Sequence, residues 1–175
     1  AGKSATLDNA SAFSNDTTSW QNTHPTASVV TIGNDGGTNS SGNTMLAYCF
    51  TPVRGFSSMG SYVGNGNASG PFIFTNGMKP AFIIIKNADD GSKNWVMLDN
   101  KRPSTGQNPA DDILFPNTSG AESSSQTDRL VDFVSNGVKI RATSLQMNGS
   151  GNTHIFMAFS DQSIVSSNGV PATAR

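Results

Sequence analysis

The amino-acid sequence predicts an all-β protein, an antiparallel β-sandwich of the jelly-roll type with about nine strands and little or no helix. Apolar and polar residues alternate with a period of two in many short segments, whereas the 3.6-residue period of an amphipathic helix is nearly absent. Gly, Asn, Pro and Ser separate these segments at intervals of roughly 8–12 residues. Residues that favour helices on a protein surface are scarce, with six Lys, five Arg and a single Glu in 175 residues.

The predicted strands each lie between turn-forming residues. In chain order they are Val29–Gly33, Thr44–Thr51, Phe56–Val63, Pro71–Thr75, Ala81–Lys86, Trp95–Asp99, Leu130–Ser135, Val138–Ala142 and Thr153–Ser160. Ala81–Lys86 is apolar on both faces, which predicts a central strand that is covered on both sides. We expect it to pair with Trp95–Asp99 across a polar loop. Pro109–Phe115 is the one segment where a short helix could form.

Asn-Gly, the strongest short signal for a β-hairpin, occurs five times. The best candidate turn is Asn136-Gly137, where both residues tolerate the positive φ of a type I′ turn. With this pair at the tip, Phe133 is predicted opposite Ile140 and Asp132 opposite Arg141. One register then gives an apolar face and a cross-strand pair of opposite charges.

The sequence also contains an internal repeat. Residues Ser41–Phe50 align without a gap to Ser150–Phe159, and the Ser, Gly, Asn, Thr and final Phe are identical. Each copy predicts a Gly-Asn turn that leads into an apolar strand. The two copies are either two equivalent binding units or two strands related by pairing or pseudo-symmetry. The shared residues are turn and core types, which favours the second interpretation.

We predict two parts, an extended N-terminal arm or linker over residues 1–28 and a β-sandwich domain over residues 29–175. The first 28 residues are rich in Ser, Thr, Asn and Ala and show no hydrophobic period, so they lack the apolar area to fold alone. Phe13 and Trp20 are candidate anchors on a neighbouring subunit. A mobile linker is the alternative.

The composition argues against several classes of partner. The formal net charge is −1 and charged residues make up 13% of the chain, so no basic footprint for nucleic acid is expected. The apolar run Ala81–Ile85 is far too short to cross a bilayer, so we expect no membrane insertion. The single cysteine, Cys49, cannot form an internal disulfide, so stability must come from packing or subunit contacts.

Residues that could bind a metal ion are few and scattered. His24, His154 and Cys49 do not form the spaced pairs that are typical of zinc sites. The loop 89–94 contains oxygen donors but lacks the alternation and the bidentate Glu of a calcium-binding EF-hand loop. We therefore predict no metal site and no cofactor.

Acidic residues offer no clear catalytic pair. Glycosidase chemistry needs two carboxylates that face each other across a cleft. Glu122 lies alone in a Ser-rich loop, and Asp111 and Asp112 are neighbours whose side chains would point apart on a strand. We predict no catalytic residue, while an active site built from Asp alone stays open as an alternative.

One cluster has the composition of a carbohydrate-binding site. Trp95, Asp99, Asn100, Lys101 and Arg102 combine an aromatic ring with amide, carboxylate and basic groups on one strand and its exit. A core Trp followed by a charged turn is the other interpretation, and the sequence favours it.

Several segments together resemble a known family. They are Met45–Phe50, Gly55–Gly66, Gly70–Thr75, Lys79–Lys86, Trp95–Arg102, Phe133–Arg141, Thr153–Phe159 and Gly169–Arg175. In order and spacing they are similar to the C-terminal domain of uncharacterised tail or virion structural proteins of marine and other environmental bacteriophages. Thr51 and Ser160 stand where that family often has an acidic residue. The resemblance supplies no catalytic residues.

The resemblance implies a non-enzymatic virion protein, made in the host bacterial cytoplasm and located on the exterior of the particle. A tail fibre or tip domain that contacts the host surface is the leading expectation. Its expected partners are further copies of itself in a homo-oligomer (a trimer), other virion proteins and host surface carbohydrate. A capsid decoration protein is the first alternative, and a polysaccharide depolymerase is the second.

Overall fold

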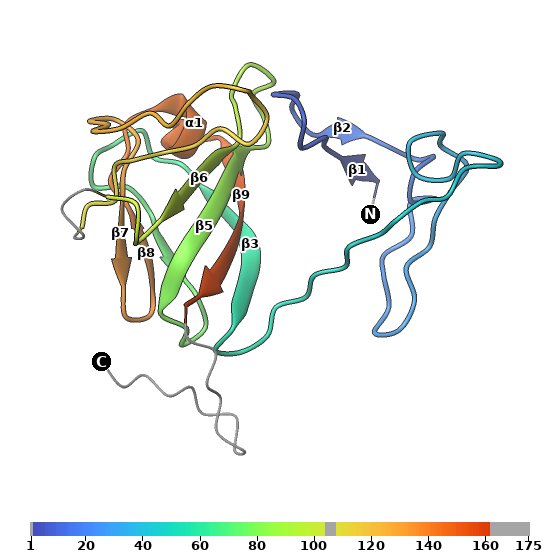
Figure 1. Ribbon diagram of the computed structural model, residues 1–175, viewed down its shortest axis with the longest axis horizontal. Helices are drawn as coiled ribbons and strands as arrows, with labels where there is room; N and C mark the ends of the chain where they lie inside the picture. Colours follow the sequence, from blue (N-terminus) through green and yellow to red (C-terminus); the bar gives the residue numbers. More distant parts are fainter. Residues whose placement is uncertain (1, 104–107, 162–175) are drawn as a thin grey trace.

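The computed structural model describes residues 2–103 and 108–161 (Figure 1). These residues form nine strands and one short helix, which confirms the predicted all-β class. The elements are β1 (Lys3–Ser4), β2 (Ser14–Asn15), β3 (Ser57–Val63), β4 (Phe72–Phe74), β5 (Pro80–Asn87), β6 (Val96–Asp99), β7 (Val131–Val134), β8 (Gly137–Ile140), α1 (Leu145–Asn148) and β9 (Thr153–Ser160).

The larger sheet has four antiparallel strands in the order β3-β9-β5-β6. The strand β5 lies inside this sheet and pairs with β6, as predicted from its apolar sequence. Ile83 on β5 is fully buried, and its neighbour Ile84, whose side chain points to the opposite face, is half-buried. The two faces of the sheet therefore differ, since one packs into the core and the other is partly exposed.

The smaller sheet has the order β4-β8-β7, and its β7–β8 hairpin differs from the predicted register by two residues. Phe133 lies opposite Val138, and Val134 lies opposite Gly137, so the turn is Ser135-Asn136 rather than Asn136-Gly137. Gly137 belongs to the strand because β4 passes close to it. A Cβ atom there would lie 2.2 Å from the carbonyl oxygen of Ile73, so only glycine fits.

The predicted faces of this hairpin survive the change of register. A shift of two residues keeps every side chain on its own face, because side chains alternate with a period of two. Phe133 and Ile140 still point into the core, and Arg141 Nη1 still donates to Asp132 Oδ2 at 2.8 Å. The type I′ geometry occurs instead at Asn76-Gly77, where φ is 54° and 77°.

Both sheets contribute to one hydrophobic core, an arrangement typical of a β-sandwich. The larger sheet supplies Ile83, Ile85, Val96, Leu98, Phe156 and Ala158, and the smaller sheet supplies Ile73, Val131, Phe133, Val138 and Ile140. Met147 of α1, a helix that the sequence did not predict, is fully buried in the same core.

Three predicted elements are wrong. Val29–Gly33 and Thr44–Thr51 are not strands, because no other segment pairs with them, and most of their residues are exposed. The predicted helix at Pro109–Phe115 is instead an extended stretch whose Ile113 pairs with Ser123 and whose Leu114 pairs with Met97. Within the described residues, no helix has the length and hydropathy to span a bilayer.

Much of the chain before β3 stands apart from the two sheets, although Thr6 and Phe13 make hydrogen bonds to the domain (Figure 1). We call residues 2–43 the N-terminal region and residues 44–53 the connecting segment. Local turns hold the N-terminal region together. Asp16 accepts hydrogen bonds from the backbone N–H groups of Thr18 and Ser19, and Gly33 donates its N–H to the Ser19 carbonyl. The connecting segment leads from this region to the start of β3.

Candidate functional site

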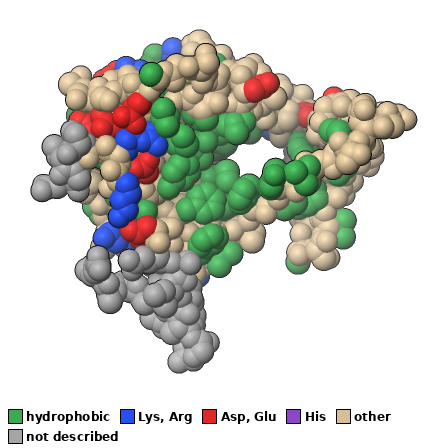
Figure 2. All heavy atoms as spheres, viewed as in Figure 1, with side chains coloured by type: hydrophobic (Ala, Val, Ile, Leu, Met, Phe, Trp, Pro, Cys, Tyr) green, Lys and Arg blue, Asp and Glu red, His purple; other side chains and the backbone are tan. Residues whose placement is uncertain are grey.

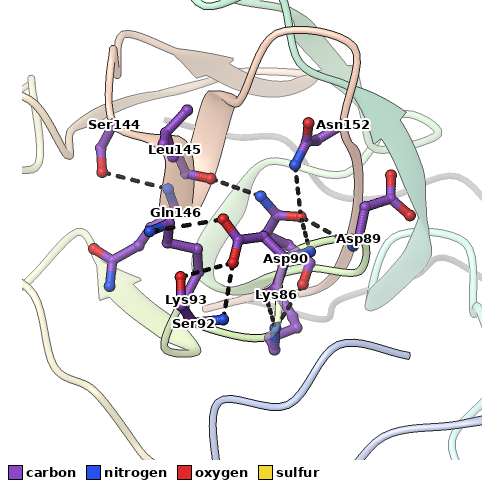
Figure 3. A network of polar contacts seen from close by, with 10 residues as sticks. Lys86, Asp89, Asp90, Ser92, Lys93, Ser144, Leu145, Gln146 and Asn152 are labelled. Atoms are coloured by element: carbon purple, nitrogen blue, oxygen red, sulfur yellow. Dashed lines mark hydrogen bonds and ion pairs between the residues drawn. The ribbon is translucent and has the colours of Figure 1, made fainter. Parts of the chain in front are cut away.

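The loop that follows β5 carries the densest polar network near the domain surface (Figure 3). Lys86 is fully buried, and its Nζ donates to the backbone carbonyls of Asn87 at 2.5 Å and Asp90 at 3.3 Å. Burial lowers the pKa of Lys86, while the nearby Asp90 carboxylate opposes this shift. The Lys86 ammonium group therefore holds the loop against the end of β5 through these two hydrogen bonds.

The carboxylates of Asp89 and Asp90 accept hydrogen bonds from neighbouring residues of the fold. Asp90 accepts hydrogen bonds from the Ser92 hydroxyl and N–H and lies 3.6 Å from Lys93 Nζ; these bonds, the hydroxyl first, lower its pKa. Asp89 accepts the N–H of Thr153 at 2.6 Å. Among the described residues, no group of three or more His, Cys, Asp and Glu side chains is arranged to hold a metal ion.

Two buried asparagines, which the sequence did not single out, join distant segments. The Asn87 amide donates to the Leu145 carbonyl at 2.8 Å and so links the loop to α1. Asn148 is fully buried, and its amide group contacts Asn65, Asn67 and Ala142. Asn-Gly pairs in the sequence indicated turns here, but only the fold shows that these side chains are structural junctions.

His154 is a fully buried residue of β9. Its ring stacks on Tyr62 at a centroid distance of 5.0 Å and an interplanar angle of 11°. The Tyr62 hydroxyl donates to the Met147 carbonyl at 2.6 Å. Burial lowers the pKa of His154 and raises the pKa of Tyr62, so the fold favours the neutral form of both side chains.

The predicted carbohydrate-binding residues lie at two different places. Trp95 is buried just before β6, and its indole N–H donates to the carbonyl of Thr6 in the N-terminal region. Asp99, Asn100, Lys101 and Arg102 form a turn at the other end of β6. The structure thus brings the four polar residues together and separates them from the aromatic ring.

The charged turn after β6 is an ion-pair cluster. Arg102 lies 2.6 Å from Asp99 Oδ2 and 3.0 Å from Glu122 Oε2, and Lys101 Nζ lies 3.7 Å from Asp161. Two buried atoms, Asn100 Oδ1 and Arg102 Nη1, have no hydrogen-bond partner. Ligand binding by this turn stays a prediction.

The acidic residues of the depolymerase alternative come closer together than the sequence indicated. The pairing of Ile113 with Ser123 puts Asp112 and Glu122 on adjacent segments. Asp112 is buried and accepts the N–H of Ser125 at 2.9 Å, whereas Glu122 pairs with Arg102. Each of these two carboxylates therefore has a partner within the fold.

Phe13 and Trp20, the predicted anchors on a neighbouring subunit, are both half-buried within their own chain. Phe13 donates its N–H to the Ala88 carbonyl at 2.9 Å, so this part of the N-terminal region lies against the loop after β5. Trp20 lies within the N-terminal region, where its carbonyl accepts the N–H of Thr23. Their contact with another subunit stays a prediction.

Hydrophobic side chains gather on the outer face of the larger sheet (Figure 2). We call this surface the outer face; it carries Met59, Phe82, Ile84, Met97, Ile155, Met157 and Phe159, all half-buried. Their cross-strand neighbours on the other face, such as Ile83 and Ala158, are fully buried in the core. Figure 2 also shows an opening between this part of the domain and the N-terminal region.

The connecting segment exposes six consecutive apolar residues, Met45–Phe50. The exposed fraction is 76% for Leu46 and 77% for Tyr48. Phe50 makes an edge-to-face contact with Phe159 at a centroid distance of 6.0 Å, which ties this end of the segment to the outer face. Monomeric proteins rarely expose a continuous apolar stretch of this kind, so it is a candidate interaction surface.

Only one long strand edge is open among the described residues. Leu114 exchanges two backbone hydrogen bonds with Met97 on β6, and Ala110 exchanges two with Val131 on β7. The edge strand β4 is only three residues long. The edge of β3 is seven residues long and has a partner only at Ser57, which pairs with Val53.

One of three comparisons with known proteins gave a match. The search of curated proteins and the search of solved structures gave no match. The scan against family models matched one model, described as a domain of unknown function (DUF7483), over residues 1–163. The match includes the N-terminal region and the connecting segment as well as both sheets. Because this match covers most of the 175 residues, the chain belongs to the DUF7483 family.

Proposed function

We propose that the chain is a non-enzymatic assembly module on the exterior of a phage particle, a tail fibre or tip domain that contacts the host. The observation that carries the assembly role is the exposed apolar run Met45–Phe50 beside the open edge of β3. An apolar segment and an unpaired edge both favour association with another chain. The location on a phage particle is proposed from the sequence resemblance to phage virion proteins.

Immunogold electron microscopy of purified particles tests this proposal. Antibodies against residues 57–161 are expected to label the tail or its tip, and mass spectrometry of the same particles is expected to detect the chain. Absence of the chain from particles that carry its gene would overturn the proposal. Host adsorption by particles with and without the domain then tests the contact with the host surface.

A capsid decoration protein is the second candidate. The N-terminal region stands away from the domain on the connecting segment, a shape that suits a clamp on a neighbouring subunit of a shell (Figure 1). Gold label distributed over the head lattice would favour this candidate over a tail fibre.

A turnover assay separates both structural candidates from a depolymerase. Under our proposal, purified protein releases no sugar from host polysaccharide. If release occurred and were lost in D112N or E122Q, the depolymerase would replace the proposal. Release that persisted in both variants would indicate a contaminating enzyme.

A further inference from the structure

We propose that the connecting segment of one copy adds as a strand to the open β3 edge of a second copy. This inference deepens the proposed function, because it names the contact through which the assembly module would associate with itself. Its basis is a segment with the sequence of a strand but without a sheet, next to a sheet edge without a strand.

The internal repeat indicates what the connecting segment can do. Its residues 44–50 match Thr153–Phe159, which form most of β9, and β9 pairs with β3 over all seven residues of that strand. The segment therefore has a sequence that, in its second copy, already forms a strand beside β3. Its ten residues are also enough to cover the free edge of β3, which is seven residues long.

The same chain does not supply this pairing in the structure, although a hairpin begins there. Val53 and Ser57 exchange two backbone hydrogen bonds at 2.9 Å and 3.0 Å, and Gly55 between them has a φ of 80°. Continuing this register along β3 would bring Phe50 opposite Gly60. The segment instead leaves the sheet after Val53.

The position of Phe50 explains why the hairpin stops. Gly60 lies opposite Phe156, which points into the core, so Phe50 in the continued register would share the face of Phe156. In the structure Phe50 contacts Phe159, which lies on the outer face. A residue cannot occupy both faces, so the aromatic contact at Phe159 and an intramolecular hairpin exclude each other.

A second copy meets the remaining requirements. Six apolar side chains on both faces of the segment need cover on both sides, which an isolated chain does not provide. Addition to β3 would pair the free N–H and C=O groups of that edge, and one row of side chains would extend the apolar outer face. Exchange of an identical element between protomers is a common route to oligomers.

Disulfide trapping with the native Cys49 tests this contact. The variants M59C, G60C, S61C and V63C each introduce one thiol on β3 and together sample both faces of the strand, because the repeat aligns Cys49 with Ala158, which faces the core. Under mild oxidation, at least one is expected to give a covalent dimer on a non-reducing gel, well above the amount from the parent chain. S124C, in an exposed loop at the opposite side of the sheet, is the matched control and is expected to give no excess dimer.

Each outcome of the trapping experiment decides the proposal. A fast-migrating monomer with an internal disulfide would show that the segment pairs within its own chain and would overturn it. No disulfide in any of the four variants, which cover both faces of β3, would also overturn it. The trapping experiment uses purified protein, and the labelling experiment uses whole particles, so the two tests are independent. Absence of a disulfide would overturn the strand addition without affecting the proposed location on the particle. Absence of label would overturn that location without affecting the trapping result.

The size of the parent chain in solution gives a second readout. Burial of two large apolar side chains is worth roughly 10-fold each in affinity, so L46D/Y48D is expected to raise the dissociation constant of the oligomer at least about 100-fold. L145D, which changes a similarly exposed leucine on α1, is the matched control and is expected to leave the oligomer unchanged. Equal dissociation constants for L46D/Y48D and the parent would overturn the proposal.

Discussion

The two-sheet domain and the N-terminal region keep their shapes by different means. In the domain, side chains from both sheets are buried in one core, and Asn148 connects segments more than 80 residues apart. In the N-terminal region, most side-chain hydrogen bonds join residues only two or three positions apart, such as those of Asp16. Core packing resists change because it is cooperative, whereas local turns can open one at a time. The two parts should therefore respond differently to substitution.

The largest difference is expected for apolar truncations. Ile83→Ala in the core should lower the free energy of unfolding by about 2–5 kcal/mol, because it leaves a cavity where the side chain is fully buried. Leu46→Ala in the connecting segment should change it by less than about 0.5 kcal/mol in the monomer. Urea denaturation followed by circular dichroism measures both. Equal losses would mean that the connecting segment packs like a core element.

Glycine substitutions should show the same contrast at a smaller scale. Gly137→Ala should cost about 1–3 kcal/mol, because its Cβ would collide with the Ile73 carbonyl and the Phe72 ring. Gly36→Ala in the N-terminal region meets no atom within 4 Å and is the matched control, expected to change stability little. Thermal unfolding of both variants measures the difference, and an unchanged melting temperature for Gly137→Ala would contradict the close approach of β4.

The stability of the domain should also depend on pH through His154. Burial lowers its pKa in the folded state below 6.5, so the unfolded chain binds the proton more readily. The contribution of His154 to the free energy of unfolding is therefore fully present above about pH 6.5. It decreases as the pH falls, by at most about 1.4 kcal/mol per pH unit. His154→Phe, which keeps a ring beside Tyr62, should flatten this slope.

The smallest effect on the domain is expected from Asp16. Hydrogen bonds from Ser19, first through its hydroxyl, hold the pKa of this carboxyl well below its usual range. Asp16→Ala should speed hydrogen exchange of the Thr18 and Ser19 amides and leave the melting temperature of the domain unchanged. A lower melting temperature would show that the N-terminal region and the domain unfold together.

Much of the domain could be predicted from its sequence, because the alternation of apolar and polar residues indicates which face of each strand is buried. The strands β5, β6 and β9, and both faces of the β7–β8 hairpin, follow from it. The register of that hairpin could not be predicted, because it depends on β4, whose backbone approaches Gly137 from about 60 residues away. Sequence alternation shows that a segment can be a strand, but not that a partner strand is available.

The same limit applies to the candidate sites. The sequence favoured a core position for Trp95 over an exposed platform, and the structure buries this side chain. The sequence could not show what covers it, because the carbonyl that accepts the indole N–H belongs to Thr6, 89 residues away. The connecting segment was predicted as a strand from its apolar run and its repeat. That prediction was wrong, because a strand needs a partner and the fold leaves this segment unpaired within its own chain.

The uneven protection of the sheet edges has a geometric consequence. With β6 and β7 shielded and β4 short, each copy would offer one donor segment and one acceptor edge. Such contacts are heterologous, so subunits would join head to tail rather than face to face. The rotation between successive copies would then decide whether the assembly closes into a ring or grows as a fibre. The length of the connecting segment, ten residues between Asn43 and Arg54, would limit that rotation.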